Sequence, residues 1–205
     1  MKNPSPHLIV ALVLLTAALV SCPAIAQTYS GNLALTTQAQ VDAFNYTEVT
    51  GKLTIGGTDV DDLSPLSMLT SVGGGLSIRY NAALEQVVDG FPNLTSAGYL
   101  GISDNPALIT LDGFRGLTNL DGGLWFYDNT NMVSVAGFSS LLETGDNMDF
   151  WNNDSLVSIS GFESLHTAGW SLEFGGNPAL TALPEFESLE TITSSLFILD
   201  HCCPR

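Results

Sequence analysis

Five side chains between residues 125 and 173 have the types and the spacing that could do chemistry. Two tryptophans, one tyrosine and two carboxylates make up the set: Trp125, Tyr127, Asp149, Trp151 and Glu173. Exposed aromatic rings with polar neighbours suit a sugar ring or an anchoring side chain of a protein partner. The same residues are also good strand formers, so they could instead cover a sheet or contact a neighbouring domain. We interpret the set as a candidate ligand-binding surface.

The two carboxylates of this set also raise the possibility of catalysis. Asp149 and Glu173 occupy equivalent places in two successive repeats of the sequence, and two carboxylates at one site could act as an acid and a base on a polysaccharide. No basic residue is expected near them, and beyond Ala26 the only histidines are His166 and His201. The sequence offers no Ser-His-Asp set and no cluster of metal ligands. We therefore expect no catalytic residue, metal or cofactor, and keep a polysaccharide-acting enzyme as an alternative.

The elements that must position these side chains belong to a short sequence repeat. An apolar pair, two residues apart, recurs at a step of 23 once and 24 five times: Leu53/Ile55, Leu76/Ile78, Leu100/Ile102, Leu124/Phe126, Met148/Phe150, Leu172/Phe174 and Leu196/Ile198. Such alternation places both apolar residues on one face of a short strand. A fixed period of this length indicates one structural unit stacked on copies of itself. We predict a mainly β fold, a parallel β-solenoid of about seven coils over residues 51–199.

The outward positions of these strands should carry the candidate binding residues. The middle outward column consists of Thr54, Ser77, Gly101, Trp125, Asp149, Glu173 and Phe197. The next outward column consists of Arg79, Ser103, Tyr127, Trp151 and Gly175. Neighbouring coils should lie about 4.8 Å apart, so Trp125 and Tyr127 are expected beside Asp149 and Trp151.

One polar column repeats without interruption. Asparagine occurs five residues after the first apolar position of five successive coils: Asn81, Asn105, Asn129, Asn153 and Asn177. A buried amide without a partner costs about 1–3 kcal/mol, so these side chains should bond to the backbone and to one another. We predict a structural ladder of asparagines rather than a catalytic row.

The rest of each coil contains further apolar columns. After the asparagine we expect inward residues at Leu84, Leu108, Met132, Leu156 and Leu180, and then at Val88, Leu111, Val135, Ile159 and Leu183. The coil should close through Phe91, Phe114, Phe138, Phe162 and Phe186, followed by Leu94, Leu117, Leu141, Leu165 and Leu189. Glycine precedes the first four phenylalanines and permits a corner there.

The two ends of the repeat differ from its middle. Residues 27–50 are predicted to form an N-terminal cap, with a strand from Asn32 to Leu35 and a short helix through Phe44 that Thr37 and Gln40 open as a capping box. Residues 200–205 form a tail, in which His201 occupies the next ladder position and the adjacent Cys202 and Cys203 follow. We expect either a fragment of a longer protein or an end covered by a second copy.

The segment from Met1 to Ala26 is typical of a signal peptide. Lys2 precedes an apolar run from Leu8 to Val20 that is too short to span a bilayer, and Ala24 and Ala26 suggest cleavage before Gln27. The residues up to Cys22 also resemble a bacterial lipobox, which would leave Cys22 lipid-modified. Both interpretations predict a protein that is secreted or held at the bacterial cell surface, with no transmembrane helix in the mature chain.

The net charge of the chain limits the classes of partner that it can bind. Five Lys and Arg residues stand against 21 Asp and Glu residues, for a net charge of −16. Nucleic acid and anionic membranes are therefore excluded as partners. The acidity favours a solvated surface, and calcium is an alternative that no contiguous calcium-binding loop supports.

The repeat pattern resembles that of receptor L-domain repeats. The segments Leu100 to Leu117 and Met148 to Leu165 both fit Leu-x-Ile-x-x-Asn-x-x-Leu-x-x-Leu-x-Gly-Phe-x-x-Leu, with conservative exchanges. Standard leucine-rich repeats differ, because there the asparagine is followed by x-Leu. The resemblance implies a right-handed solenoid like the ligand-binding lobes of insulin-type and growth-factor receptors, and it implies no catalytic residues.

Together these features predict a non-enzymatic binding or adhesion module outside the cytoplasm. Its expected partner is an unidentified protein or carbohydrate on the exposed face of the solenoid. The alternative is a structural spacer or a fragment of a larger surface protein.

Overall fold

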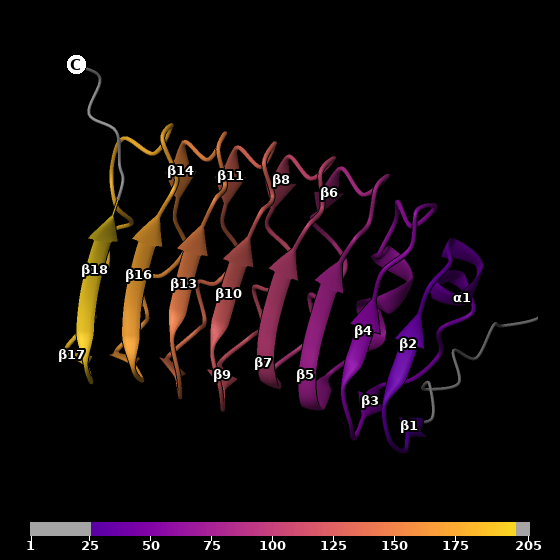
Figure 1. Ribbon diagram of the computed structural model, residues 1–205. Coiled ribbons are helices and arrows are strands. Elements are labelled where there is room, and N and C mark those ends of the chain that lie inside the picture. The colour runs from indigo at the N-terminus through magenta and orange to yellow at the C-terminus, as the bar shows by residue number, and fades with distance from the viewer. Residues whose placement is uncertain (1–25, 200–205) are drawn as a thin grey trace, which may run out of the picture.

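The computed structural model describes residues 26–199 and shows a parallel β-solenoid whose coils stack along one axis (Figure 1). The apolar pairs lie in register from coil to coil, for example Leu100 beside Leu124 and Ile102 beside Phe126. The predicted fold class is therefore confirmed. The predicted signal peptide with Cys22 and the tail with His201, Cys202 and Cys203 lie outside the described residues.

The broad face of the solenoid, here called the front ladder, is the row of arrows that runs from β2 to β18 in Figure 1. Its strands pair in parallel, each with the equivalent strand of the next coil. They are β2 (Leu33–Leu35), β4 (Leu53–Ile55), the second half of β5 (Ser71–Arg79), the second half of β7 (Ser96–Ser103), β10 (Leu124–Tyr127), β13 (Met148–Trp151), β16 (Ser171–Gly175) and β18 (Ser195–Leu199).

A second ladder, the side ladder, comes just before the front ladder in each coil and was not predicted. It consists of β1 (Thr28–Tyr29), β3 (Glu48–Val49), the first residues of β5 and β7, β9 (Asn119–Leu120), β12 (Glu143–Thr144), β15 (Thr167–Ala168) and β17 (Thr191–Ile192). Because β5 and β7 run through both ladders, the two form one sheet of 14 strands.

A third ladder, the back ladder, closes the coil on the opposite side. Its four strands are β6 (Gln86–Val87), β8 (Thr110–Leu111), β11 (Ser134–Val135) and β14 (Ser158–Ile159). The first coils also hold the short helix α1 (Gln38–Asp42) and the 3₁₀ helix η1 (Ser64–Met68), which has a proline in its first turn. Each later coil thus has three sides, and the core fills the space between them.

The apolar columns of the front ladder form the centre of this core. From Leu53 to Phe174 their side chains are at most 2% exposed. Two residues of the back column differ from prediction. Val87 is buried in place of Val88, because it follows Leu84 by three residues as Leu111 follows Leu108. Leu183 is 37% exposed, and Pro184 is buried instead.

Phenylalanines stack along the solenoid in two columns inside the core. Rings from successive coils lie nearly parallel, with centroids 5.1 Å apart for Phe138 and Phe162 in one column and 4.9 Å apart for Phe126 and Phe150 in the other. Directly before Phe138 and Phe162, Gly137 and Gly161 have φ values of 87° and 85°, a backbone region that a side chain would disfavour. The stacked rings therefore repeat at the spacing of the coils.

The five asparagines form a continuous hydrogen-bonded ladder and are fully buried. The Asn129 Oδ1 atom accepts from the backbone N–H and the Nδ2 of Asn105, at 3.3 and 3.1 Å. The Asn129 Nδ2 donates to the carbonyl oxygen of Ile102 at 2.9 Å and to the Oδ1 of Asn153 at 3.3 Å. Each amide thereby links neighbouring coils at the turn that follows the front ladder.

The residue before each ladder asparagine adopts a left-handed backbone conformation. The φ values are 60° for Tyr80, 55° for Asp104, 57° for Asp128, 56° for Asn152 and 63° for Gly176. Asp, Asn and Gly tolerate this conformation better than other residues do. Tyr80 is therefore the strained member of the column.

The N-terminal segment joins the solenoid through β2, which pairs in register with β4. The Thr37 side chain accepts from the backbone N–H of Gln40 at 3.3 Å, but the Gln40 side chain accepts from Thr36 at 2.6 Å rather than from Thr37. The helix ends at Asp42, before the predicted end at Phe44. Phe44 leaves it because its ring turns inward against Tyr46, with the two centroids 5.6 Å apart.

In β18, the last described strand, the inward side chains are exposed to solvent. Leu196 and Ile198 are 50% and 48% exposed, although the equivalent residues of the preceding coil are buried. The inward position itself is therefore not enough for burial; a following coil is also required.

Candidate functional site

The outward face of the front ladder presents three columns of side chains rather than the two that the sequence indicated. The additional column precedes the first apolar residue of each strand. Its members are Lys52, Gly75, Tyr99, Gly123, Asn147, Ser171 and Ser195. Tyr99 thereby joins the predicted site residues on the same face.

Four aromatic residues on this face form what we call the aromatic platform: Tyr99, Trp125, Tyr127 and Trp151. Trp125 lies in register with Asp149, and Tyr127 with Trp151, across β10 and β13. The ring centroids of Tyr99 and Trp125 are 5.0 Å apart. All four side chains are half-buried, so each ring contacts the protein and also meets solvent.

Glycines provide the space in which three of these rings lie. A Cβ atom added to Gly75, Gly123 or Gly175 would come within 3.0 Å of the ring of Tyr99, Trp125 or Trp151, respectively. Gly75 and Gly175 are register partners of Tyr99 and Trp151 on the neighbouring coils. The rings therefore rest against backbone, which restricts their movement.

Asp149 is predicted at an outward position, but the residue is only 4% exposed. The Tyr127 hydroxyl donates a hydrogen bond to Asp149 Oδ2. The other oxygen, Oδ1, is buried without a hydrogen-bond partner, as is the Oδ1 of Asn147. Burial raises the pKa of the Asp149 carboxyl above its ordinary value, and the nearby Glu173 raises it further, whereas the side chains of Tyr127 and Asn147 oppose this rise through hydrogen bonding.

Glu173 lies beside Asp149 in register on β16 and is half-buried. Its Oε1 atom accepts a hydrogen bond of 2.6 Å from the Ser171 hydroxyl. Burial and the bond to Asp149 raise the pKa of the Tyr127 hydroxyl far above its ordinary value, so this hydroxyl stays a donor. Two carboxylates thus lie among the aromatic rings, and each accepts from a neighbouring hydroxyl.

One end of the aromatic platform already holds a cation. The Lys52 ammonium lies 5.5 Å from the centre of the Tyr99 ring, within the range of a cation–π interaction. Gly75 stands between these residues in the same column and has no side chain to separate them. Of the lysines and arginines within residues 26–199, none lies over Trp125 or Trp151.

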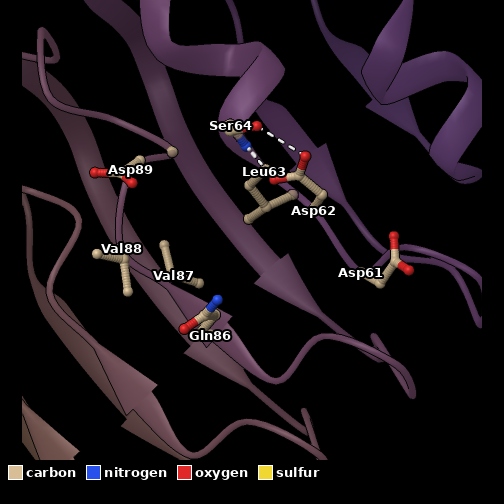
Figure 2. Close-up of a pocket in the computed structure, with 9 residues that line it drawn as sticks. Asp61, Asp62, Leu63, Ser64, Gln86, Val87, Val88 and Asp89 are labelled. Atoms are coloured by element: carbon tan, nitrogen blue, oxygen red, sulfur yellow. Dashed lines mark hydrogen bonds between the residues drawn. The ribbon is translucent and has the colours of Figure 1, made fainter.

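A second acidic region lies away from the front ladder, between η1 and β6. Figure 2 shows this pocket of about 170 Å³, which contains the carboxylates of Asp61, Asp62 and Asp89. Asp62 accepts from the backbone N–H and the hydroxyl of Ser64, at 2.8 and 2.7 Å, at the start of η1. Asp61 and Asp89 lie at opposite sides of the pocket (Figure 2), so the three carboxylates do not converge.

Two searches of the described residues bear on metals and membranes. Within residues 26–199, His, Cys, Asp and Glu side chains form no group of three or more that could hold a metal ion. No helix in the same range has the length and apolar character needed to cross a membrane.

Comparisons with known proteins gave no relative: no family model, no curated protein and no solved structure matches the chain. The candidate site is therefore defined by its own geometry. It consists of the aromatic platform with Asp149 and Glu173 between and beside its rings.

Proposed function

We propose that the chain is a non-enzymatic binding or adhesion module that recognises a protein or glycan through the aromatic platform. The observation that carries this proposal is the set of four half-buried aromatic rings, three of them packed on glycines, on a face where the fold demands no aromatic residue. Rings held in place before binding lose little conformational freedom when a partner arrives. Aromatic anchors of this kind contribute much of the affinity at protein and carbohydrate interfaces.

The expected location supports the same proposal. The signal peptide predicted for residues 1–26, or the lipobox ending at Cys22, would place the chain outside the cytoplasm of a bacterium. The resemblance of the repeats to receptor L-domains points the same way, since such lobes bind ligands on their exposed face.

The test uses the full chain on a glycan array and on immobilised intact bacterial cells. Trp125→Ala combined with Trp151→Ala should abolish retention, while far-ultraviolet circular dichroism stays unchanged. Trp170→Ala is the matched control, because Trp170 is 58% exposed and lies outside the aromatic platform. Equal retention of the double variant and the unaltered chain would refute the proposal.

Catalysis by the carboxylate pair is tested in the same samples. Asp149 and Glu173 each accept from a hydroxyl of the protein itself, an arrangement that supports a structural and electrostatic role over acid–base chemistry. Turnover of any glycan on the panel, lost in Asp149→Asn or Glu173→Gln, would contradict the non-enzymatic assignment.

A structural spacer is the second candidate function. The observation in its favour is the apolar strand β18, where Leu196, Phe197, Ile198 and Leu199 are 44–50% exposed. Side chains of this kind suit coverage by a further structural element. Retention that is independent of the aromatic platform but lost in Leu196→Asp and Ile198→Asp would favour this function.

A further inference from the structure

The outward face of the front ladder carries its charges in two separate places. Lys52 precedes β4 and Arg79 ends β5, whereas Asp149 and Glu173 lie on β13 and β16. From β2 to β10, strands that lie side by side in Figure 1, no acidic residue occupies an outward position of this ladder. The N-terminal half of the face is therefore positive, although the chain as a whole is acidic.

The two cations of this half have no carboxylate partner among the described residues. Within residues 26–199 the basic residues are Lys52, Arg79 and Arg115, and the one ion pair joins Arg115 to Asp112. The Lys52 ammonium lies instead over the Tyr99 ring, 5.5 Å from its centre. An anionic group of a ligand can therefore pair with Lys52 and Arg79 without breaking an ion pair of the protein.

Two aromatic rings in contact with each other adjoin these cations. The ring centroids of Tyr99 and Trp125 are 5.0 Å apart and the ring planes are tilted by 38°. A Cβ atom at Gly101 would lie 3.6 Å from the Trp125 ring and 3.9 Å from the Tyr99 ring, so both rings border this glycine. Half-buried rings of this kind offer an apolar surface on which a sugar ring can pack.

A hydroxyl without a protein partner lies beside the rings. Ser77 belongs to the middle outward column, with Thr54 and Gly101 as its register partners. The residue is only 8% exposed, yet within residues 26–199 no group forms a hydrogen bond with its side chain. Strand alternation directs the hydroxyl to the outward face, and a polar group of a ligand would satisfy it.

The acidity of the chain limits the size of an anionic ligand rather than excluding it. At physiological salt, charges act over about 8 Å, and β13 with Asp149 is three strands from β5, about 14 Å away. Lys52 and Arg79 therefore determine the local potential near Ser77. The net charge of −16 still repels long polyanions. Two separate cations match single negative charges, as carboxylates carry, better than the doubled charge of a phosphate.

We propose that the N-terminal half of this face binds a short glycan of uronic acids, sugars that carry a carboxylate. One sugar packs on Tyr99 and Trp125 and pairs its carboxylate with Lys52. A neighbouring sugar reaches Arg79, which lies further along the strand direction, and a sugar hydroxyl bonds to Ser77. This inference rests on the proposed binding function and specifies its ligand class.

A matched pair of probes tests the charge directly. Tetragalacturonic acid is compared with its methyl ester, which keeps the sugar rings and removes the negative charges. Binding to the full chain is measured by isothermal titration calorimetry at about 0.15 M salt. The acid should bind about tenfold more tightly than the ester, because a hydrogen-bonded charge contributes more than a neutral group.

Variants of the basic residues assign this preference to the face. Lys52→Gln should weaken binding of the acid about tenfold and leave that of the ester unchanged, while Lys52→Arg should keep the preference. Arg79→Gln should weaken binding of the acid about threefold, since Arg79 is exposed. Arg115→Gln is the matched control and should have no effect. Trp125→Ala should weaken binding of both probes.

Equal or tighter binding of the ester would overturn the inference, as would the absence of binding of both probes, or equal effects of Lys52→Gln and Arg115→Gln. The proposed function is judged separately, by retention on the array and on cells. If the double variant Trp125→Ala and Trp151→Ala still abolished retention, the binding function would stand without the carboxylate preference. The two failures are therefore distinguishable.

Discussion

The asparagine ladder and the outward columns of the front ladder recur at the same spacing, yet only the outward columns change residue type from coil to coil. The ladder keeps one residue type through five coils, and every amide is buried and bonded to its neighbours. The middle outward column changes residue in each coil, from Gly101 to Trp125 to Asp149 to Glu173. Repetition therefore marks positions that the fold requires, and variation marks positions at which the fold accepts different side chains.

The two regions also differ in how completely their polar groups are satisfied. The Asn129 amide makes hydrogen bonds to groups in both neighbouring coils. Asp149, in contrast, keeps one buried oxygen without a partner. Such a group opposes stability.

The largest expected effect tests the ladder. Asn129→Ala removes the partner of four buried polar groups, so the free energy of unfolding should fall by about 3–5 kcal/mol. Urea denaturation followed by circular dichroism measures it. Asn131→Ala is the matched control: Asn131 is exposed and donates one hydrogen bond to the carbonyl oxygen of Pro106, so its loss should cost about 1 kcal/mol or less. A similar loss of unfolding free energy in Asn129→Ala and Asn131→Ala would show that the buried ladder contributes no more to stability than an exposed asparagine.

A smaller effect on stability, but a clear one on binding, is expected from Gly175→Ala. The added Cβ would overlap the Trp151 ring, which must move away from its place on the platform. Near-ultraviolet circular dichroism should change, and retention on the glycan array or on cells should weaken. Gly101→Ala is the control, since its Cβ would meet Trp125 at 3.6 Å, an ordinary contact. Unchanged retention of Gly175→Ala would show that the packing of Trp151 on this glycine does not affect binding.

The contribution of Asp149 to the free energy of unfolding should depend on pH, unlike that of the ladder asparagines. The pKa of Asp149 is raised in the folded protein above its ordinary value, so ionisation of this group disfavours folding above that folded pKa. The penalty is absent below the unfolded pKa. Asp149→Asn should therefore increase the free energy of unfolding at about pH 7, and the gain should disappear at about pH 3. Destabilisation by Asp149→Asn at the higher pH would show that the charge supports the fold.

The smallest expected effect concerns Tyr80, in the column of left-handed residues that directly precedes the asparagine ladder. Tyr80 has a φ of 60° where the later coils have Asp, Asn or Gly. Tyr80→Asn should raise the free energy of unfolding by about 0.5–1 kcal/mol, measured as a shift of the denaturation midpoint. Asp104→Asn, at an equivalent position, should change it by less than about 0.5 kcal/mol. A loss of stability in Tyr80→Asn would indicate that the stacking of Arg79 on the tyrosine ring outweighs the strain.

Much of the architecture could be predicted because its inward residues repeat in type as well as in spacing. The pairs of the front ladder and the asparagines are examples. The side ladder was missed because its inward column mixes large, small and polar residues: Val72, Ala97, Leu120, Thr144 and Ala168. No apolar period is visible in such a column, although the backbone pairs there as regularly as elsewhere.

The candidate site was only partly accessible from the sequence. Strand alternation places Trp125 and Trp151 on the outward face, and the same alternation, extended by two residues toward the N-terminus, would have added Tyr99. The burial of Asp149 could not be predicted in this way, because it depends on where the Tyr127 hydroxyl and the neighbouring side chains lie. Outward direction and solvent exposure are separate properties on a crowded sheet.

The stacking of coils along one axis has a mechanical consequence. Each strand pairs with the equivalent strands of the adjacent coils. Tension applied to the two ends of the solenoid should therefore unfold the terminal coil first, while the strands of the other coils stay paired. One unwound turn frees about 80 Å of extended chain. Under force the molecule should therefore lengthen in regular increments, each from the unfolding of one coil.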